Sequence, residues 1–229
     1  MSKIIGIIGA MDIEIDGLVS SMTKKKATEI SGIKFYQGKL CVKEVVVAKC
    51  GIGKVFASIC AQAMILKFNP SVIINTGVAG TLDRDLHVLD IAIASSVVQH
   101  DMDTSALGDP VGLISGINIV EFNTNEEVVK ALKFACENVK SLFKSGTIAT
   151  GDKFVHLSQD KEWIKAQFNA IACEMEGGAI GHTCYVNKTP FGIIRAISDG
   201  EGATMDYLTF SKHAAQKSIE IVKKFVEIY

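Results

Sequence analysis

The 229-residue sequence has no long hydrophobic run, little proline and no excess of charge of either sign. No apolar stretch is long enough to span a membrane, and three prolines are too few for a proline-rich linker between domains. Lys and Arg total 24 against 25 Asp and Glu, and the only basic run, Lys24–Lys26, is expected to be solvated. This balance provides no strong field for nucleic acid or a membrane surface, so we expect small-molecule partners, with no nucleic acid and no membrane.

The sequence also lacks the cysteine spacings of disulfide or zinc proteins. It has no C-x-x-C pair and no Cys/His grouping at zinc spacing, so we expect a reducing, cytoplasmic location, no metal and no cofactor. The apolar opening Ile4–Met11 could suggest a signal peptide, but Asp12 and Glu14 follow at once, so a buried first strand is the better interpretation. All six cysteines are expected in apolar surroundings: Cys41, Cys50, Cys60, Cys136, Cys173 and Cys184.

With 48% hydrophobic and 21% charged residues, the chain can bury a large core, and we expect a single domain over residues 1–229. Residues 27–48 partly alternate polar and apolar around Gly32 and Gly38, which predicts antiparallel hairpins and therefore a mixed sheet. Elsewhere short apolar runs alternate with helical segments, which is typical of an α/β fold. The runs expected as strands are Ile4–Ile8, Glu44–Ala48, Val72–Asn75, Asp90–Val98, Gly146–Ala149, Ala170–Cys173 and Phe191–Ile197.

Three segments carry apolar residues at helical spacing. Glycines at 51 and 53 mark the turn before the first helix, and Thr124 with Glu127 predicts a capping box that opens the second. Each apolar stripe is expected to pack in the core: Val55, Ile59, Ala63 and Leu66; Val128, Leu132, Cys136 and Val139; and Leu208, Ala215, Ile219, Val222 and Val226.

Two polar segments follow apolar strands in the first half of the chain, where α/β folds usually hold their ligands. Asp12 and Glu14 begin a helix, so they either complement its dipole or contribute to a site. The segment lacks the G-x-G-x-x-G spacing, which argues against a Rossmann oxidoreductase. Asn75–Gly80 ends another strand, and its glycines favour either close approach of the backbone to a ligand or a plain tight turn.

Two further segments place charge beside a strand in the second half. Glu174 and Glu176 are costly near a core unless they are paired, so function is favoured over a solvated helix start. Ribose hydroxyls would be suitable donors to such a carboxylate. Arg195 lies in a strand that ends at Asp199, which is either a turn residue or a third site acid. Together with Glu14, these acids could divide the roles of acid and base.

Six motifs occur in order along nearly the whole chain: IIGAMxxE (7–14), GIGKV (51–55), NTGxAG (75–80), TGDxF (150–154), EMEGxAI (174–180) and RAISD (195–199). Together they closely resemble the motif set of the bacterial 5′-methylthioadenosine/S-adenosylhomocysteine nucleosidases, which belong to the nucleoside phosphorylase superfamily. The resemblance implies a single-domain three-layer α/β fold with a central mixed, partly barrel-like sheet. It also implies a role in methionine salvage.

The resemblance implies hydrolysis of the N-ribosidic bond of methylthioadenosine, S-adenosylhomocysteine and 5′-deoxyadenosine. Glu14 would be the general base for water, Asp199 the general acid at adenine N7, and Glu176 would hold the ribose hydroxyls. These roles suit an oxocarbenium-like transition state. The related phosphorylases carry arginine where Asn75 stands and a phosphate-binding environment where Glu14 stands. A carboxylate there would repel phosphate, so water is the expected nucleophile.

The resemblance also implies contacts to the rest of the substrate. Phe154 would stack on adenine and the backbone of Val155 would read its edge, while Met175 would pack against the sugar. Ser198 would position the general acid, and Phe210 would line the pocket for the 5′ substituent. The implied substrate-binding residues are Met11, Ile52, Gly80, Phe154, Val155, Met175, Glu176, Arg195, which would lie near the water, Ser198 and Phe210.

The sequence departs from the family pattern at two places. Val78 stands where many relatives have serine, and the loop of residues 100–116 offers Leu107, Asp109 and Pro110 in place of aromatic residues. In relatives this loop reaches the partner subunit's site. The resemblance therefore implies a homodimer in which the loop around Leu107 completes the neighbour's site, with an altered preference for the 5′ group.

Three other functions remain open from the sequence. A phosphorylase would require phosphate, and a nucleosidase for another 6-aminopurine ribonucleoside, such as aminodeoxyfutalosine, would be revealed by substrate competition. A non-catalytic nucleoside sensor would be expected to have lost Glu14 or Asp199, and the sequence retains both.

Overall fold

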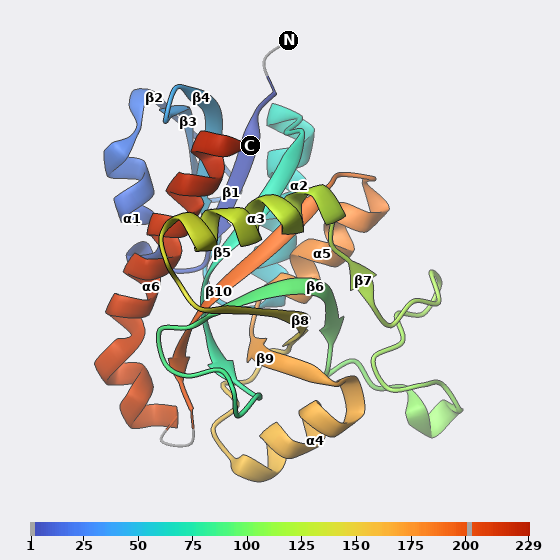
Figure 1. Cartoon of the computed structure of the whole chain (residues 1–229). Helices are drawn as coiled ribbons and strands as arrows, with labels where there is room; N and C mark the ends of the chain where they lie inside the picture. Colours follow the sequence, from blue (N-terminus) through green and yellow to red (C-terminus); the bar gives the residue numbers. More distant parts are fainter. Residues whose placement is uncertain (1–2, 201–202) are drawn as a thin grey trace.

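The computed structural model describes residues 3–200 and 203–229, and it shows helices packed on both sides of a ten-stranded sheet (Figure 1). The strands are β1 (Ile5–Gly9), β2 (Thr23–Ile30), β3 (Ile33–Leu40), β4 (Lys43–Lys49), β5 (Val72–Thr81), β6 (Ile91–Gln99), β7 (Phe122–Asn123), β8 (Phe143–Thr150), β9 (Ala170–Glu174) and β10 (Phe191–Asp199). The helices are α1 (Asp12–Ser21), α2 (Lys54–Phe68), η1 (Ser105–Leu107), α3 (Glu126–Asn138), α4 (Ser158–Phe168), α5 (Gly177–Val186) and α6 (Ala203–Ile228).

Part of the sheet closes on itself. The strand order β10-β6-β8-β9-β5 returns to β10 because β5 also pairs with β10. Besides β10, strand β5 pairs with two further strands along its length. Its first half pairs with β1, and its end pairs with β9 at Gly80 and Thr81. The ring combines three parallel pairs (β6–β8, β8–β9 and β5–β10) with two antiparallel pairs (β10–β6 and β5–β9), and the rest of the sheet continues through β1, β4, β3 and β2. The predicted mixed, partly barrel-like sheet is therefore confirmed.

The two helical layers bury different sides of the sheet. Helices α1, α3 and α6 share one apolar core with β1, β4 and β10, while α2 and α5 pack in a second core on the other side (Figure 1). Every residue of β1, β9 and β10 is buried, as expected for strands covered on both faces. The hairpins predicted in residues 27–48 are also confirmed, since β2, β3 and β4 pair antiparallel.

The prediction for the apolar face of α2 was wrong. Val55 is 70% exposed, Ile59 41% and Leu66 75%, and Ala63 is half-buried. The buried residues lie on the other face of the helix: Ala57, Cys60, Ala61 and Met64. Both faces of α2 are apolar, so helical periodicity alone could not identify the buried one. The consequence is a surface helix with an uncovered apolar stripe.

The prediction of a capping box formed by Thr124 and Glu127 at the start of α3 was also wrong. The N-cap is Asn125, whose Oδ1 accepts a hydrogen bond from the Val128 N–H at 3.1 Å. The Thr124 hydroxyl instead donates to the carbonyls of Ala94 and Ser95 in β6. Both residue types can accept such a bond from a helix N-terminus, and here the hydroxyl satisfies the neighbouring strand. The α3 stripe itself is confirmed: Val128, Leu132 and Cys136 are buried and Val139 is partly buried.

The stripe of α6 is confirmed except at its beginning. Ala215, Ile219, Val222 and Val226 are buried, whereas Leu208 is 72% exposed. Within the described part of α6, the predicted stripe is therefore buried from Ala215 onward.

All six cysteines lie in the described part of the chain and are free. Five are buried as expected, but Cys41 is exposed in the turn between β3 and β4. Within the described residues, the search for a membrane-spanning helix finds none of the required length and apolar character.

Candidate active site

A cavity of about 230 Å³ lies where β5, β9 and β10 end and where α1 begins. Its walls carry four buried carboxylates: Glu14, Glu174, Glu176 and Asp199. Ends of neighbouring strands are the usual place for ligand sites in α/β folds. The fold therefore brings together the three acids on which the sequence interpretation depends.

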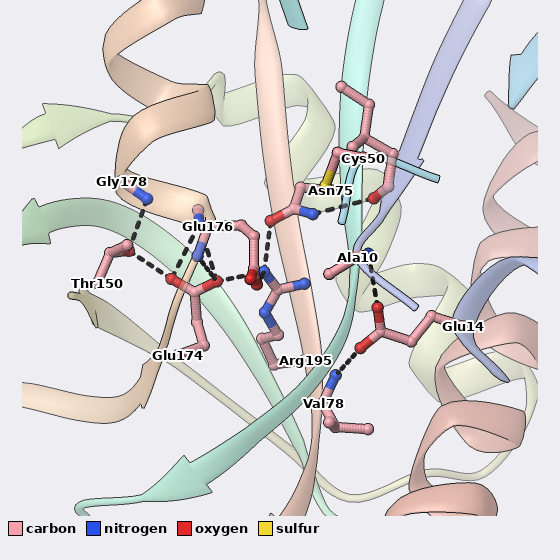
Figure 2. Close-up of polar contacts among 12 residues, drawn as sticks. Ala10, Glu14, Cys50, Asn75, Val78, Thr150, Glu174, Glu176, Gly178 and Arg195 are labelled. Atoms are coloured by element: carbon pink, nitrogen blue, oxygen red, sulfur yellow. Dashed lines mark hydrogen bonds and ion pairs between the residues drawn. The ribbon is translucent and has the colours of Figure 1, made fainter. Parts of the chain in front are cut away.

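Glu14 lies in the first turn of α1 and is only 3% exposed. Its Oε2 accepts hydrogen bonds from the N–H groups of Ala10 (2.7 Å) and Met11 (3.0 Å), and Oε1 accepts from Val78 N–H at 3.1 Å (Figure 2). Burial raises the pKa of Glu14, although Arg195 and the three N–H donors oppose this rise. Glu14 is thus a fixed carboxyl with a pKa displaced toward neutral pH, which suits a general base.

Glycine is required at position 77, in the part of β5 beside Glu14. A Cβ on Gly77 would lie 2.5 Å from Glu14 Oε1 and 2.8 Å from Arg195 Nη1. Residues 75–80 belong to β5, so the glycines of this motif allow close approach and do not form a tight turn. The missing side chain leaves the space in which Glu14 and Arg195 come near each other.

Glu174, at the wall of the cavity, forms a buried ion pair with Arg195 behind it, and both side chains are 1% exposed. Glu174 also accepts hydrogen bonds from the Thr150 hydroxyl and from the N–H groups of Glu176 and Gly177 (Figure 2). Although burial alone would raise the pKa of Glu174, Arg195 and these donors lower it overall. Glu174 is therefore an ionised structural partner of Arg195, and its oxygens are already occupied.

Glu176 is the N-cap residue of α5, and its carboxylate lies on the cavity side of this pair. Its Oε1 accepts a hydrogen bond from Gly53 N–H at 2.9 Å, and its Oε2 lies 3.7 Å from Arg195 Nη2. Burial and the nearby Glu174 raise the pKa of Glu176 to about 8. A carboxyl with so few internal partners is available to a ligand's hydroxyl groups.

Asp199 ends β10 and is 2% exposed. The Ser198 hydroxyl donates to its Oδ1 at 2.9 Å, and Lys161 Nζ lies 3.7 Å from its Oδ2. A Cβ on Gly80 would lie 2.8 Å from that same Oδ2, so β5 must carry glycine opposite the carboxyl. Burial raises the pKa of Asp199 against the opposing effects of Ser198 and Lys161, which favours the protonated form of a general acid.

The aromatic wall is partly different from the expected one. Phe154 lines the cavity as expected, but Phe210 is half-buried on α6 and is not among the described residues that line it. Tyr207, one turn earlier, lines the cavity: its ring meets Phe154 edge-on at 5.4 Å and its hydroxyl donates to Met11 Sδ at 3.4 Å.

The comparisons with known proteins bear on this geometry. The model of the family described as "Phosphorylase superfamily" matches residues 4–227. The chain belongs to the phosphorylase superfamily. Among its relatives, a 5′-methylthioadenosine/S-adenosylhomocysteine nucleosidase of Staphylococcus haemolyticus is 40% identical over 227 residues, covering 98% of this chain and 99% of the relative.

Two solved structures of this superfamily show the same fold. The Neisseria meningitidis 5′-methylthioadenosine/S-adenosylhomocysteine nucleosidase in complex with methylthio-immucillin-A has a TM-score of 0.95 and 35% identity, covering 99% of this chain and all of that one. The native futalosine hydrolase of Helicobacter pylori has a TM-score of 0.95 and 34% identity, covering 100% of this chain and 99% of that one. The resemblance read from the motifs and the expected nucleoside phosphorylase-like fold are confirmed.

Most of the expected site residues of this superfamily member meet in one place. Val155 lines a small hollow that adjoins the cavity beside Phe154 and Asp199, and Arg195 lies behind the wall in its ion pair. Those that line the cavity itself are Met11, Glu14, Ile52, Gly80, Phe154, Met175, Glu176, Ser198 and Asp199.

The sequence interpretation assigned no role to Lys161 and Tyr207, or to Glu174 on its own. The E-x-E spacing signalled Glu174 but could not show which of the two acids pairs with Arg195 and which has few internal partners. No local signal marked Lys161 or Tyr207, because their roles depend on how α4 and α6 pack.

Proposed function

We propose that this protein hydrolyses the N-ribosidic bond of 5′-methylthioadenosine and S-adenosylhomocysteine, and also of 5′-deoxyadenosine, releasing adenine and the 5-substituted ribose. The observation that carries the proposal is the meeting of Glu14, Glu176 and Asp199 in one cavity, each in a different environment. The names of the superfamily relatives, which are nucleosidases for the first two substrates, support the same conclusion.

In this mechanism Asp199 is the general acid. Cleavage leaves electron density on adenine, and a protonated carboxyl near N7 neutralises it as the bond breaks. Because the Ser198 hydroxyl donates to Oδ1 of Asp199, Oδ2 is the oxygen that carries the proton toward adenine. Burial supports this role because it raises the pKa of Asp199 and so favours the protonated acid.

Glu14 activates the attacking water. Its carboxylate is held on both oxygens by backbone N–H groups, so its direction does not depend on the substrate. Burial brings its pKa nearer to neutral pH, where a base can both be ionised and accept a proton efficiently. At position 78 only the backbone N–H binds Glu14, so the side-chain hydrogen bond near the water that serine would offer in many relatives is missing here.

Glu176 binds the ribose hydroxyls while positive charge develops on the sugar. The positive charge on the sugar favours the ionised form of Glu176 over the protonated form that burial favours, and the carboxylate then stabilises the sugar electrostatically, as in glycoside hydrolysis. Met175 lines the cavity next to Glu176 and packs against the sugar. The ion pair between Glu174 and Arg195 holds the strand ends on which these groups stand.

The two ends of the substrate are recognised by different walls. Phe154 stacks on adenine and the backbone of Val155 reads the edge of the base, beside the general acid. Met11, Ile52 and Tyr207 line the remaining wall and receive the 5′ substituent. Tyr207 adds a hydroxyl to this apolar surface, so the 5′ subsite can accept a polar as well as a thioether group.

Water is proposed as the nucleophile instead of phosphate. Arg195 Nη2 is engaged by Glu174 and by Asn75 Oδ1 at 2.5 Å, and the Asn75 amide donates to the Ile8 carbonyl at 2.9 Å. A phosphate dianion at this place would meet the carboxyl of Glu14, while the charge of Arg195 is already balanced by Glu174. Repulsion between like charges therefore disfavours phosphorolysis.

The test is adenine release from methylthioadenosine in phosphate-free buffer, with the sugar product identified and the assay repeated with phosphate. Free methylthioribose without phosphate is the expected result. Adenine release that requires phosphate, with a sugar phosphate as product, would overturn the assignment of water as nucleophile.

A second candidate is hydrolysis of a 6-aminopurine ribonucleoside with a larger 5′ group, such as aminodeoxyfutalosine. The similarity to the Helicobacter pylori futalosine hydrolase favours it, as does the hydroxyl of Tyr207 in the 5′ wall. Competition between the two nucleosides decides between the candidates, because the preferred one has the higher kcat/KM.

We further propose a cytoplasmic homodimer. Helices α2 and α5 expose apolar side chains on one side, and a groove of about 610 Å³ runs between them. Ile52 lines the cavity and is 56% exposed next to this surface, and Leu107 is 84% exposed on its loop, ready to complete a neighbour's site. The exposed apolar residues of the two helices are Val55, Phe56, Ile59, Leu66, Tyr185 and Val186.

Burial of such a stripe is the usual use of a large exposed apolar patch. Ile59→Asp should therefore give monomers with reduced activity in sedimentation and activity assays. A wild-type protein that is monomeric and fully active at working concentration would refute the homodimer.

A further inference from the structure

The carboxylate of Glu176 is held by the backbone of a remote segment. Gly53, the N-cap residue of α2, donates its N–H to Glu176 Oε1 at 2.9 Å. The φ angle of Gly53 is +98°, in the region that favours glycine, and a Cβ there would lie 3.0 Å from Asp152 Oδ1. The backbone at this position is therefore confined between the two carboxylates.

Three charged residues from three segments meet around Gly53. Asp152 Oδ1 accepts a hydrogen bond from the Lys54 N–H at 2.8 Å, and the Asp152 N–H donates to Asp101 Oδ2 at 2.8 Å. Lys54 Nζ lies 2.6 Å from Asp101 Oδ1, which completes a closed ring of contacts. We call Lys54, Asp101 and Asp152 the clasp.

The side chains of two of the three clasp residues are partly sheltered from solvent, while Asp152 is exposed. The Lys54 side chain is 20% exposed and that of Asp101 is 29% exposed. Although partial burial would raise the pKa of Asp101, the hydrogen bonds from Lys54 and from the Asp152 N–H lower it overall. Asp101 is therefore ionised at neutral pH, and a network of this kind holds its geometry better than an isolated surface pair.

None of the three clasp residues is among the described residues that line the cavity. Lys54 lies at the start of α2, Asp101 in the turn after β6, and Asp152 in the segment after β8. The clasp therefore joins three separate parts of the chain. Gly53 connects the clasp directly to the cavity, because its N–H binds the carboxylate of Glu176.

We infer that the clasp is a positioning device that holds Gly53 so that Glu176 is directed at the ribose hydroxyls. The inference rests on the proposed function, because it assigns the clasp to the sugar contact of that reaction. Its consequence is selective: loss of the clasp weakens the recognition of the sugar hydroxyls and leaves the adenine contacts intact.

The experiment compares Asp101→Ala with wild type on methylthioadenosine and on its 2′-deoxy counterpart, in the full-length protein. We expect Asp101→Ala to lower kcat/KM for methylthioadenosine by about tenfold, equivalent to about 1.4 kcal/mol, with kcat and KM both affected. The loss should be much smaller for the deoxy substrate. In the background of Glu176→Gln, the same substitution should cost little more, because the contact through which the clasp acts is already lost.

The matched control is Lys144→Met against Lys54→Met. Lys144 also makes a long-range ion pair at 2.6 Å, with Asp83, and it lies outside the cavity lining. We expect Lys54→Met to reproduce the selective loss and Lys144→Met to leave both substrates unchanged. Melting curves establish that all variants are folded.

Equal losses on the two substrates, or additive losses with Glu176→Gln, would show a merely structural role and overturn the inference. Unchanged kinetics in Asp101→Ala would do the same. If the wild type releases no adenine, the proposed function fails instead. The clasp is then tested by calorimetric binding of the two nucleosides, where the same selective loss is expected and its absence overturns the inference.

Discussion

Replacement of Arg195 by methionine tests the charge balance beneath the cavity. Arg195 is 1% exposed and is the cation that faces Glu174, Glu176 and Glu14. The variant leaves Glu174 as a buried carboxylate without its partner, which costs about 3–5 kcal/mol in comparable buried pairs. For a chain of this size, that cost corresponds to a fall in melting temperature of about 6–20 °C.

The fall in melting temperature caused by Arg195→Met should depend on pH in a defined direction. In the wild type the pKa of Glu174 is lowered, so its contribution to stability is present above the ordinary pKa and is lost as the pH falls. In the variant, burial is no longer opposed by Arg195, so the pKa of Glu174 is raised and ionisation at high pH destabilises the fold. The difference in melting temperature should therefore be largest at pH 8 and shrink toward pH 5.

The assay is thermal unfolding followed by circular dichroism across that pH range. Arg84→Met is the matched control, because Arg84 is exposed and its loss should change stability by no more than about 0.5 kcal/mol. The double variant with Glu174→Gln should recover part of the loss. A melting temperature within about 2 °C of wild type, or a deficit that does not vary with pH, would refute this account of the ion pair.

Three further predictions concern the reaction. Asp199→Asn and Glu14→Gln should each lower kcat by at least about 10²-fold, because an amide can neither deliver nor accept the proton. Calorimetry should show that both variants still bind the nucleoside. Near-wild-type turnover in either variant would contradict the role assigned to that residue. Gly77→Ala should lower kcat/KM by about 10²-fold, because its methyl group would lie 2.5 Å from Glu14 Oε1 and displace the base; unchanged kinetics would show that the site tolerates the shift. The pH profile of kcat/KM should be bell-shaped, falling at low pH as Glu14 is protonated above its ordinary pKa of 4.5 and at high pH as Asp199 ionises above its ordinary pKa of 3.8; a profile that stays flat from pH 5 to 9 would contradict both assignments.

The sequence was most informative for strands that are buried on both faces, because their residues are apolar at nearly every position. Strands such as β10 were located within a residue or two. Glu14 and Asp199 were singled out because each acid lies close to the end of an apolar strand, and their proposed roles came from the resemblance and not from local pattern.

Prediction failed where two surfaces compete for the same pattern. Helix α2 is apolar on both faces, so its period could not show that Ile59 faces outward while Met64 faces the core. Phe210 and Tyr207 are both aromatic and one turn apart on α6, and the orientation of that helix decides that Tyr207 lines the cavity. Such choices depend on tertiary packing, which no local pattern contains.

The distribution of exposed and buried thiols allows the folded protein to be labelled at a single position. Cys41 is exposed in the turn between β3 and β4, while the other five cysteines are buried, and burial raises the pKa of Cys60, Cys136, Cys173 and Cys184 to about 12. Alkylation requires the thiolate, so a maleimide dye should attach at one position on the folded chain. Two batches labelled with donor and acceptor dyes would then report exchange between subunits as energy transfer, with no engineered cysteine and no change to the cavity.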